Sequence, residues 1–286
     1  MRFVAEWLNQ TAIDRRGCWE GDLYRLATLV SPGWSAPWFN LGLLAKHAHR
    51  WEDSMRFNQR AVELNSNSQA AWWNLGVAAT ALRDWEEARR AWAGFGIEVP
   101  GTSGEVRLDP QDACVRLNPG TDGEVVWGTR LDPARLLVLN VPRPESGHRY
   151  RDIVLNDGVP EGTRELGGIK VSVFDELQLW EASDYLTYQV ELEVPSEAAV
   201  PRLLEACRDP DLGVEDCSTI RMTCDECSRG NLAPHVCSNV ASPSSRRKFA
   251  FGAHEEEELR SALNRWRSEV PGADYGPIQQ VFPLKT

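Results

Sequence analysis

The residues best suited to chemistry form a short cysteine–histidine cluster in the C-terminal part of the sequence. A Cys-x-x-Cys pair is followed by a His-x-Cys pair, which gives the four side chains Cys224, Cys227, His235 and Cys237. Two thiolates separated by two residues can reach one tetrahedral ion, and a further thiolate and imidazole complete a Cys3His set. Four protein ligands leave zinc no open position for a substrate, so we expect a structural zinc ion.

Two other interpretations of this cluster stay open. The Cys-x-x-Cys pair could be a redox dithiol, although such pairs usually begin a helix in a thioredoxin-like unit and this segment reads as a loop. The cysteines could also be unpaired thiols close together by chance, and Cys217 is an alternative ligand to Cys237. The total of seven cysteines is odd and unevenly spread, which disfavours a disulfide framework and favours a reducing, cytoplasmic location.

Histidine–carboxylate groups elsewhere in the sequence give weaker signals for catalysis. His148 precedes Asp152 and Asp157 in a turn-rich segment, but no nucleophile lies nearby in the sequence. His254 precedes four consecutive glutamates, which spread around a helix and are favoured at its N-terminus by the helix dipole. The sequence has no nucleophile elbow, P-loop or dinucleotide fingerprint, so we predict that the chain is not an enzyme.

The elements that would position the cysteine–histidine cluster belong to a segment at 184–286. We expect strands at 185–194, 214–223, 248–252 and 277–283, and helices at 195–207 and 255–269. This order matches the ferredoxin-like split βαβ arrangement, with a zinc-binding insertion at 222–240 before the third strand. The ferredoxin-like fold hosts many unrelated activities, so it assigns no function.

Residues 105–180 predict a series of short strands separated by turn dipeptides. We expect these strands at 114–117, 124–127, 136–141, 153–155 and 169–174. Pro-Gly, Asp-Gly, Asn-Asp-Gly and Gly-Gly sequences stand between them and are typical of tight turns. The spacing predicts a small, strongly curved sheet or barrel.

The first hundred residues contain an internal repeat. Trp38-Phe-Asn-Leu-Gly42 recurs as Trp72-Trp-Asn-Leu-Gly76, and Trp51-Glu-Asp recurs as Trp85-Glu-Glu, both at an offset of 34 residues. Apolar residues recur at three- and four-residue steps throughout, which indicates helices. A 34-residue period with Trp, Leu-Gly and a second aromatic–acidic helix start resembles the tetratricopeptide repeat.

This resemblance covers residues 3–100 and implies a stack of three helical hairpins, the first a degenerate copy in residues 3–32. We expect Gly42 and Gly76 to lie where paired helices cross. Asn58 departs from the family pattern, which usually has an aromatic residue there, and Ser66 stands where a proline is usual. Phe95 replaces a small residue of the pattern, so we expect the last helix to cap the stack.

Stacks of this family bind partners on a concave face lined by the first helix of each hairpin. On the family template, that face carries Phe39, Asn40, Leu43, Trp73, Asn74 and Val77. Family members that clamp a carboxylate tail use Lys and Arg where this chain has Phe39 and Trp73. An apolar groove edged by amides would instead suit a helix or extended segment with aliphatic anchors. The alternative is that the second half of the chain already fills the groove.

Charge is divided unevenly along the chain. Lys and Arg total 31 against 42 for Asp and Glu, a net charge of −11, and residues 1–100 carry 11 of each sign. The acidic balance therefore lies entirely in residues 101–286, which disfavours nucleic acid as a partner. No apolar run approaches the roughly 20 residues of a membrane-spanning helix, so we expect no membrane segment.

The sequence thus predicts an α+β protein with a helical repeat domain (1–100), a β-rich segment (105–180) and a ferredoxin-like domain (184–286). We expect a non-enzymatic protein that binds another protein through the repeat groove. Its acidic half would speed encounter with a basic partner, as in an immunity or antitoxin-like neutraliser of a bacterial effector. Two alternatives stay open: a scaffold subunit of a larger assembly, and an enzyme with a site on the 105–180 loops.

Overall fold

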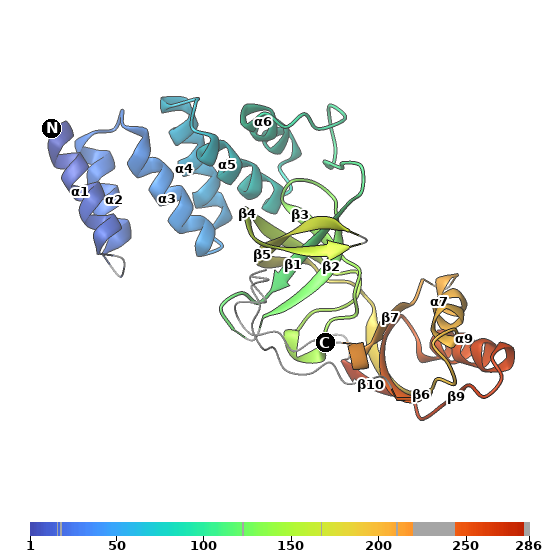
Figure 1. Cartoon of the computed structure of the whole chain (residues 1–286). Coiled ribbons are helices and arrows are strands. Elements are labelled where there is room, and N and C mark those ends of the chain that lie inside the picture. Colours follow the sequence, from blue (N-terminus) through green and yellow to red (C-terminus); the bar gives the residue numbers. More distant parts are fainter. Residues whose placement is uncertain are drawn as a thin grey trace. The chain divides into compact units, whose positions relative to one another are not determined.

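The computed structural model describes residues 1–286 except 16, 18, 122, 167, 210, 220–243 and 283–286. The described residues form eight α-helices and two five-stranded sheets, which confirms the mixed α+β class (Figure 1). The chain divides into two compact units, Met1–Asp109 with Leu131–Ala134, and Pro110–Arg130 with Arg135–Thr286. Among the described helices, none has the length and apolar character needed to cross a bilayer.

The first unit, called the helical unit below, consists of six helices in which consecutive members pair as hairpins (Figure 1). They are α1 (Arg2–Asp14), α2 (Glu20–Val30), α3 (Ser35–His47), α4 (Trp51–Leu64), α5 (Gln69–Ala81) and α6 (Trp85–Phe95). The turns α3–α4 and α5–α6 repeat the same backbone, because His49 and Arg83, 34 residues apart, both have positive φ. The next helix in each case opens on Trp followed by two acidic residues, which the helix dipole favours.

Two glycines allow the helices of a hairpin to cross closely. A Cβ on Gly42 would overlap the Asn58 amide, and a Cβ on Gly76 would lie 2.6 Å from the Trp92 ring. Asn58 and Trp92 are both fully buried and occupy equivalent places, 34 residues apart. The Asn58 amide donates to the Ser54 carbonyl at 2.8 Å, so a hydrogen-bonded amide fills the position taken by a ring in the next hairpin.

In the second unit, five strands close into a barrel (Figure 1). They are β1 (Gln111–Leu117), β2 (Glu124–Arg130), β3 (Arg135–Val138), β4 (Ile153–Leu166) and β5 (Ile169–Glu181). Consecutive strands pair antiparallel, and β1 meets β5 in parallel with Cys114 opposite Val173. The interior is filled by small and branched apolar residues, including Val115, Leu136 and Val154.

The expectation of a turn at Asn156-Asp157-Gly158 was wrong, because these residues lie inside β4. The pairing of β4 with β5 changes register between Asn156 and Pro160 and again before Gly162. Irregularities of this kind accommodate glycine and proline within a strand, so the two breakers bend β4 without ending it. Strands β4 and β5 are therefore much longer than the sequence suggested.

The second sheet has the strand order β10-β6-β8-β7, and a short strand β9 also pairs with β6. Its elements are β6 (Leu186–Glu193), α7 (Ala199–Arg208), β7 (Gly213–Asp216), β8 (Arg246–Ala253), α9 (Glu256–Glu269), β9 (Asp274–Tyr275) and β10 (Gln279–Phe282). Helices α7 and α9 share one core with the sheet, and the buried Trp266 indole donates to the Ala199 carbonyl at 2.9 Å.

The strand expected at 214–223 ends earlier than predicted. Strand β7 stops at Asp216, and a short 3₁₀ turn, Cys217–Thr219, follows it. The Asp216 carboxylate accepts from the Ser218 backbone N–H at 2.9 Å and from its hydroxyl at 2.6 Å. A local side-chain acceptor of this kind competes with strand pairing, and it explains why β-branched Thr219 does not extend the strand.

Candidate functional site

A pocket opens among the first three helices of the helical unit. It has a volume of about 260 Å³ and is lined by Ile13, Glu20, Tyr24, Asn40, Leu43, Leu44 and His47. Ile13 comes from α1, Glu20 and Tyr24 come from α2, and the other four residues come from α3.

The periodicity of α3 explains why four of its residues line the pocket. The four residues lie at steps of three, one and three along the helix, so they share one of its faces. They are Asn40, Leu43, Leu44 and His47. The opposite face carries Leu41, Gly42 and Ala45, which are buried. The two leucines of the pocket are only half-buried, and they give it an aliphatic wall.

Polar groups stand beside this aliphatic wall. The Tyr24 hydroxyl donates to Glu20 Oε1 at 3.3 Å, and Asn40 Nδ2 donates to Asn9 Oδ1 at 2.9 Å. His47 is exposed on the last turn of α3. An ionised carboxylate can accept about four hydrogen bonds, so Glu20 keeps capacity for a donor from a ligand. The pocket therefore combines an apolar cavity with a negative group at its edge.

The structure brings two of the six expected groove residues, Asn40 and Leu43, into this pocket. Phe39 is half-buried and packs against the apolar cluster formed by α4, α5 and α6. Trp73 meets Trp92 and Phe95 edge-to-face, with ring centroids 5.2 and 5.0 Å apart. Asn74 and Val77 are buried. The equivalent face of α5 is thus closed, whereas the face of α3 is open.

Sequence reasoning missed the contribution of α1 and α2 to the pocket. Ile13, Glu20 and Tyr24 lie in the copy that lacks the Trp–Leu–Gly pattern, so the template offered no equivalent positions. One signal was available. Trp19-Glu20 repeats the aromatic–acidic pair that opens α4 and α6, and it correctly places Glu20 at the start of a second helix.

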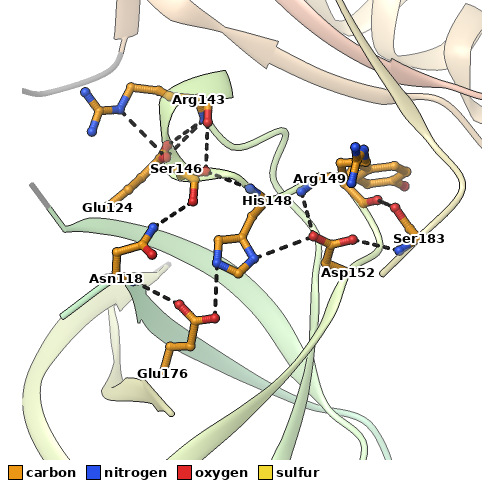
Figure 2. A network of polar contacts seen from close by, with 10 residues as sticks. Asn118, Glu124, Arg143, Ser146, His148, Arg149, Asp152, Glu176 and Ser183 are labelled. Carbon is orange, nitrogen blue, oxygen red and sulfur yellow. Dashed lines mark hydrogen bonds and ion pairs between the residues drawn. The ribbon is translucent and has the colours of Figure 1, made fainter. Parts of the chain in front are cut away.

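The barrel holds a second polar group, centred on the buried side chain of His148 (Figure 2). His148 Nε2 lies 3.1 Å from Glu176 Oε1, and Nδ1 lies 3.5 Å from Asp152 Oδ2. Burial opposes protonation of the imidazole, but hydrogen bonds and charge from the two carboxylates outweigh it and raise the pKa of His148 to about 9. The imidazole is therefore protonated at neutral pH.

Both carboxylates have further partners in this network (Figure 2). Asp152 accepts from the backbone N–H groups of Arg149 at 2.8 Å and Ser183 at 2.7 Å, and Glu176 accepts from that of Asn118 at 2.9 Å. A protonated imidazole held between two hydrogen-bonded carboxylates cannot act as a general base. The network ties the end of β1 to β5 and to the segment before β4.

The expected zinc ligands Cys224, Cys227, His235 and Cys237 lie outside the described residues. The alternative ligand Cys217 is described, and burial raises the pKa of its thiol to about 11. Within the described part of the chain, no group of three or more His, Cys, Asp or Glu side chains is arranged to hold a metal ion.

Comparison with known proteins adds little to this geometry. No protein-family model matches the chain, and no curated protein matches its sequence. A solved structure of a hypothetical protein from Neisseria gonorrhoeae aligns with 63% of this chain and 99% of its own length, at 14% identity and a TM-score of 0.27. A similarity at that TM-score assigns neither a fold nor an activity.

Proposed function

We propose that this chain is a non-enzymatic binding protein that recognises a segment of another protein through the pocket of α1, α2 and α3. The observation that carries the proposal is the pocket itself, with Leu43 and Leu44 as an aliphatic wall and Glu20 at its edge. Its volume of about 260 Å³ falls below the roughly 300–1,000 Å³ of small-molecule sites. One or two side chains of a protein segment fit such a space better than a cofactor does.

The lining defines the segment that would bind. An aliphatic anchor such as Leu, Ile or Met would lose water against Ile13, Leu43 and Leu44. A neighbouring Lys or Arg could then donate a charge-assisted hydrogen bond to Glu20. We therefore propose a partner segment that carries an aliphatic residue next to a basic one. A helix or an extended strand could present that pair.

We include the tetratricopeptide repeat in this proposal as the architecture of the helical unit. Its support is the 34-residue spacing shared by the close glycines, their buried partners and the positive-φ turn residues. For the C-terminal sheet we propose the ferredoxin-like fold, supported by the strand order β10-β6-β8-β7 with two helices in one core.

The charge of the chain suggests the kind of partner. The net charge of −11 arises entirely outside the first hundred residues, so a basic protein would be attracted at long range and then anchored at the pocket. We therefore propose an immunity or antitoxin-like protein that neutralises a basic effector, because this function uses both the acidic charge and the pocket. The second candidate is a scaffold subunit of a larger assembly. The His148 cluster is not the basis of the proposal, because its imidazole is paired with two carboxylates that backbone N–H groups hold in place.

A matched pair of variants tests the pocket. Leu43→Asp places a charge in the aliphatic wall, and we expect it to weaken binding more than tenfold, because an unpaired carboxylate would be desolvated there. The measurement is calorimetric titration with a partner first captured on the wild-type chain from a lysate of the encoding organism. Leu204→Asp, on the exposed face of α7, is the control and should bind like wild type. If Leu43→Asp binds the partner as tightly as wild type does, the pocket is not the binding site.

We also propose that Cys224, Cys227, His235 and Cys237 hold one structural zinc ion. Elemental analysis of protein purified without added metal should give about one zinc per chain. The double change Cys224→Ser with Cys227→Ser should abolish it, because only two of the four ligands remain. Cys207→Ser, a change in the buried core of α7, should retain the metal. Absence of zinc together with freely titrating thiols at Cys224 and Cys227 would contradict the assignment.

A further inference from the structure

The α1–α2 hairpin exposes an unusual amount of apolar surface. Phe3 is 80% exposed, Trp7 59%, Trp19 72% and Leu29 77%, and Val4 and Leu26 are nearly half exposed. We call these six residues the α1–α2 apolar face.

Both helices that carry this face are also apolar on their inner sides. In α1, the buried Ala5, Leu8 and Ala12 alternate with the exposed Phe3 and Trp7. In α2, Ala27 is buried, whereas Leu26 and Leu29 on either side of it are exposed. Both helices also carry exposed charged side chains, so the exposed apolar groups cover only part of each helix. Large apolar groups exposed together on a surface mark an interaction site. The face therefore has the character of an interface.

The size of the face matches what a stable protein pair needs. A large aromatic side chain contributes about 150–250 Å² when fully exposed, so the six residues together expose roughly 700 Å². That exceeds the roughly 300–600 Å² of the largest apolar patch on a typical monomer. It approaches the roughly 800 Å² that each partner contributes to a standard interface. The area is sufficient for one partner of similar size.

The other end of the helical unit shows which pairing is favoured. Helix α6, which is described throughout, exposes Glu86, Arg90 and Ala93 and has no large apolar side chain exposed. Head-to-tail stacking of two chains would place the α1–α2 apolar face on this polar surface. A two-fold axis would instead place the face on its own copy, which is complementary by construction.

Charge agrees with pairing through this hairpin. Residues 1–100 carry equal numbers of basic and acidic side chains, whereas the rest of the chain carries the whole net charge of −11. Two copies therefore repel each other least when they meet through the helical unit. Next to the face, Arg2 pairs with Glu6 at 2.8 Å and Arg25 pairs with Asp22 at 2.9 Å. This balance of signs gives an anionic lipid surface no electrostatic advantage.

We propose that two copies of this chain associate through the α1–α2 apolar face in a two-fold symmetric dimer. The first test is the mass of the full chain in solution, measured by light scattering after gel filtration at roughly 10 µM, a concentration at which a standard interface associates. Wild type should be dimeric. Trp7→Glu with Leu29→Glu should raise the dimer Kd by at least about 100-fold, because each change removes a central anchor and adds like charge.

Three further samples make the test specific. Val159→Glu, an equally exposed apolar residue on β4, is the control and should stay dimeric. Trp7→Lys with Leu29→Lys should be monomeric alone. Mixing this variant with the double glutamate variant should restore a dimer, because any pairing of the two faces then joins opposite charges. Far-UV circular dichroism of each variant should match wild type, since positions 7 and 29 are exposed.

The proposal fails if wild type is monomeric, or if the double glutamate variant remains dimeric. Restored dimers in the mixture would show that the same face meets itself. A mixture that stays monomeric while wild type is dimeric would overturn the two-fold arrangement. Flotation with phosphatidylcholine–phosphatidylserine vesicles distinguishes the competing occupant. If wild type is monomeric and binds the vesicles, and Trp7→Glu abolishes this binding, the α1–α2 apolar face binds a membrane surface. That result would overturn the dimer.

Discussion

Among the described residues, the six helices of the helical unit bury mostly small neutral polar groups, such as Ser54, Asn58 and Thr80, and Lys46 is the exception. The second unit instead buries charged side chains, including Arg135, His148 and Asp152. The interior of the helical unit therefore depends mainly on how well side chains fit, because a ring or an amide fills the space above a glycine. Ionisation governs much of the second, where each buried charge depends on its partner. Changes of volume and changes of pH should accordingly act on different units.

The largest expected effect comes from Trp92→Ala in the helical unit. Trp92 is fully buried above Gly76 and contacts Trp73 edge-to-face, so its removal leaves a cavity between the helices. We expect a loss of about 3–5 kcal/mol in the free energy of unfolding. Native-state hydrogen exchange should show the loss in peptides of α5 and α6 and leave β4 and β5 unchanged. The control is Leu204→Ala, at an exposed position, which should leave the exchange unchanged. Equal losses of exchange protection in both units after Trp92→Ala would show that packing in the two units is not independent.

The second prediction concerns the pH dependence of the barrel. The pKa of His148 is raised to about 9 from an ordinary value near 6.5, so its stabilising contribution is complete below about pH 6.5 and is lost as the pH rises through 9. The loss should be on the order of 2–3 kcal/mol. Hydrogen exchange of β4 and β5 peptides across this range measures it. His148→Gln should make the hydrogen exchange of β4 and β5 nearly independent of pH in this range. The control is His49→Gln, on the exposed α3–α4 turn, which should leave the pH dependence unchanged. A His148→Gln variant with the wild-type pH dependence would contradict the role of His148.

The smallest expected effects on stability come from substitutions at the two close glycines of the helical unit. Gly42→Leu and Gly76→Leu both overpack a helix crossing, and each should cost about 1–3 kcal/mol. The Gly76 variant should cost more, because Trp92 is a rigid ring, whereas the Asn58 amide can rotate away from a new side chain. Chemical denaturation followed by circular dichroism compares them. Unchanged midpoints for both variants would exclude close helix crossings at these glycines.

The helical unit could be predicted closely because its information is local and repeated. Trp38 and Trp72, with the glycines that follow them, mark α3 and α5 at a fixed spacing that needs no knowledge of distant residues. The five barrel strands could be found for the same reason. Their lengths could not, because whether Gly158 and Pro160 end β4 or bend it depends on pairing with β5, far along the chain.

The pocket could be predicted only in part. Asn40 and Leu43 follow from the repeat, but Ile13 and Tyr24 lie in a copy too degenerate to align. Burial of Val77 and Asn74 depends on the folded surroundings, which no repeat pattern contains. Likewise, the spacing of His148 and Asp152 suggested their pairing, whereas Glu176 joins them only because β5 folds back across β4. Contacts between distant strands were the information that the sequence pattern lacked.

The parallel closure of the barrel has a consequence for how the chain folds during synthesis. Strand β1 completes its pairing only with β5, and the Arg116–Asp175 ion pair across this seam joins residues 59 positions apart. The helical hairpins need only neighbouring residues, so they can form as soon as they leave the ribosome. One edge of β1 must then wait for β5, exposed to other chains, while the residues between them are made. The rate of translation between β1 and β5 should therefore govern how much of the protein aggregates.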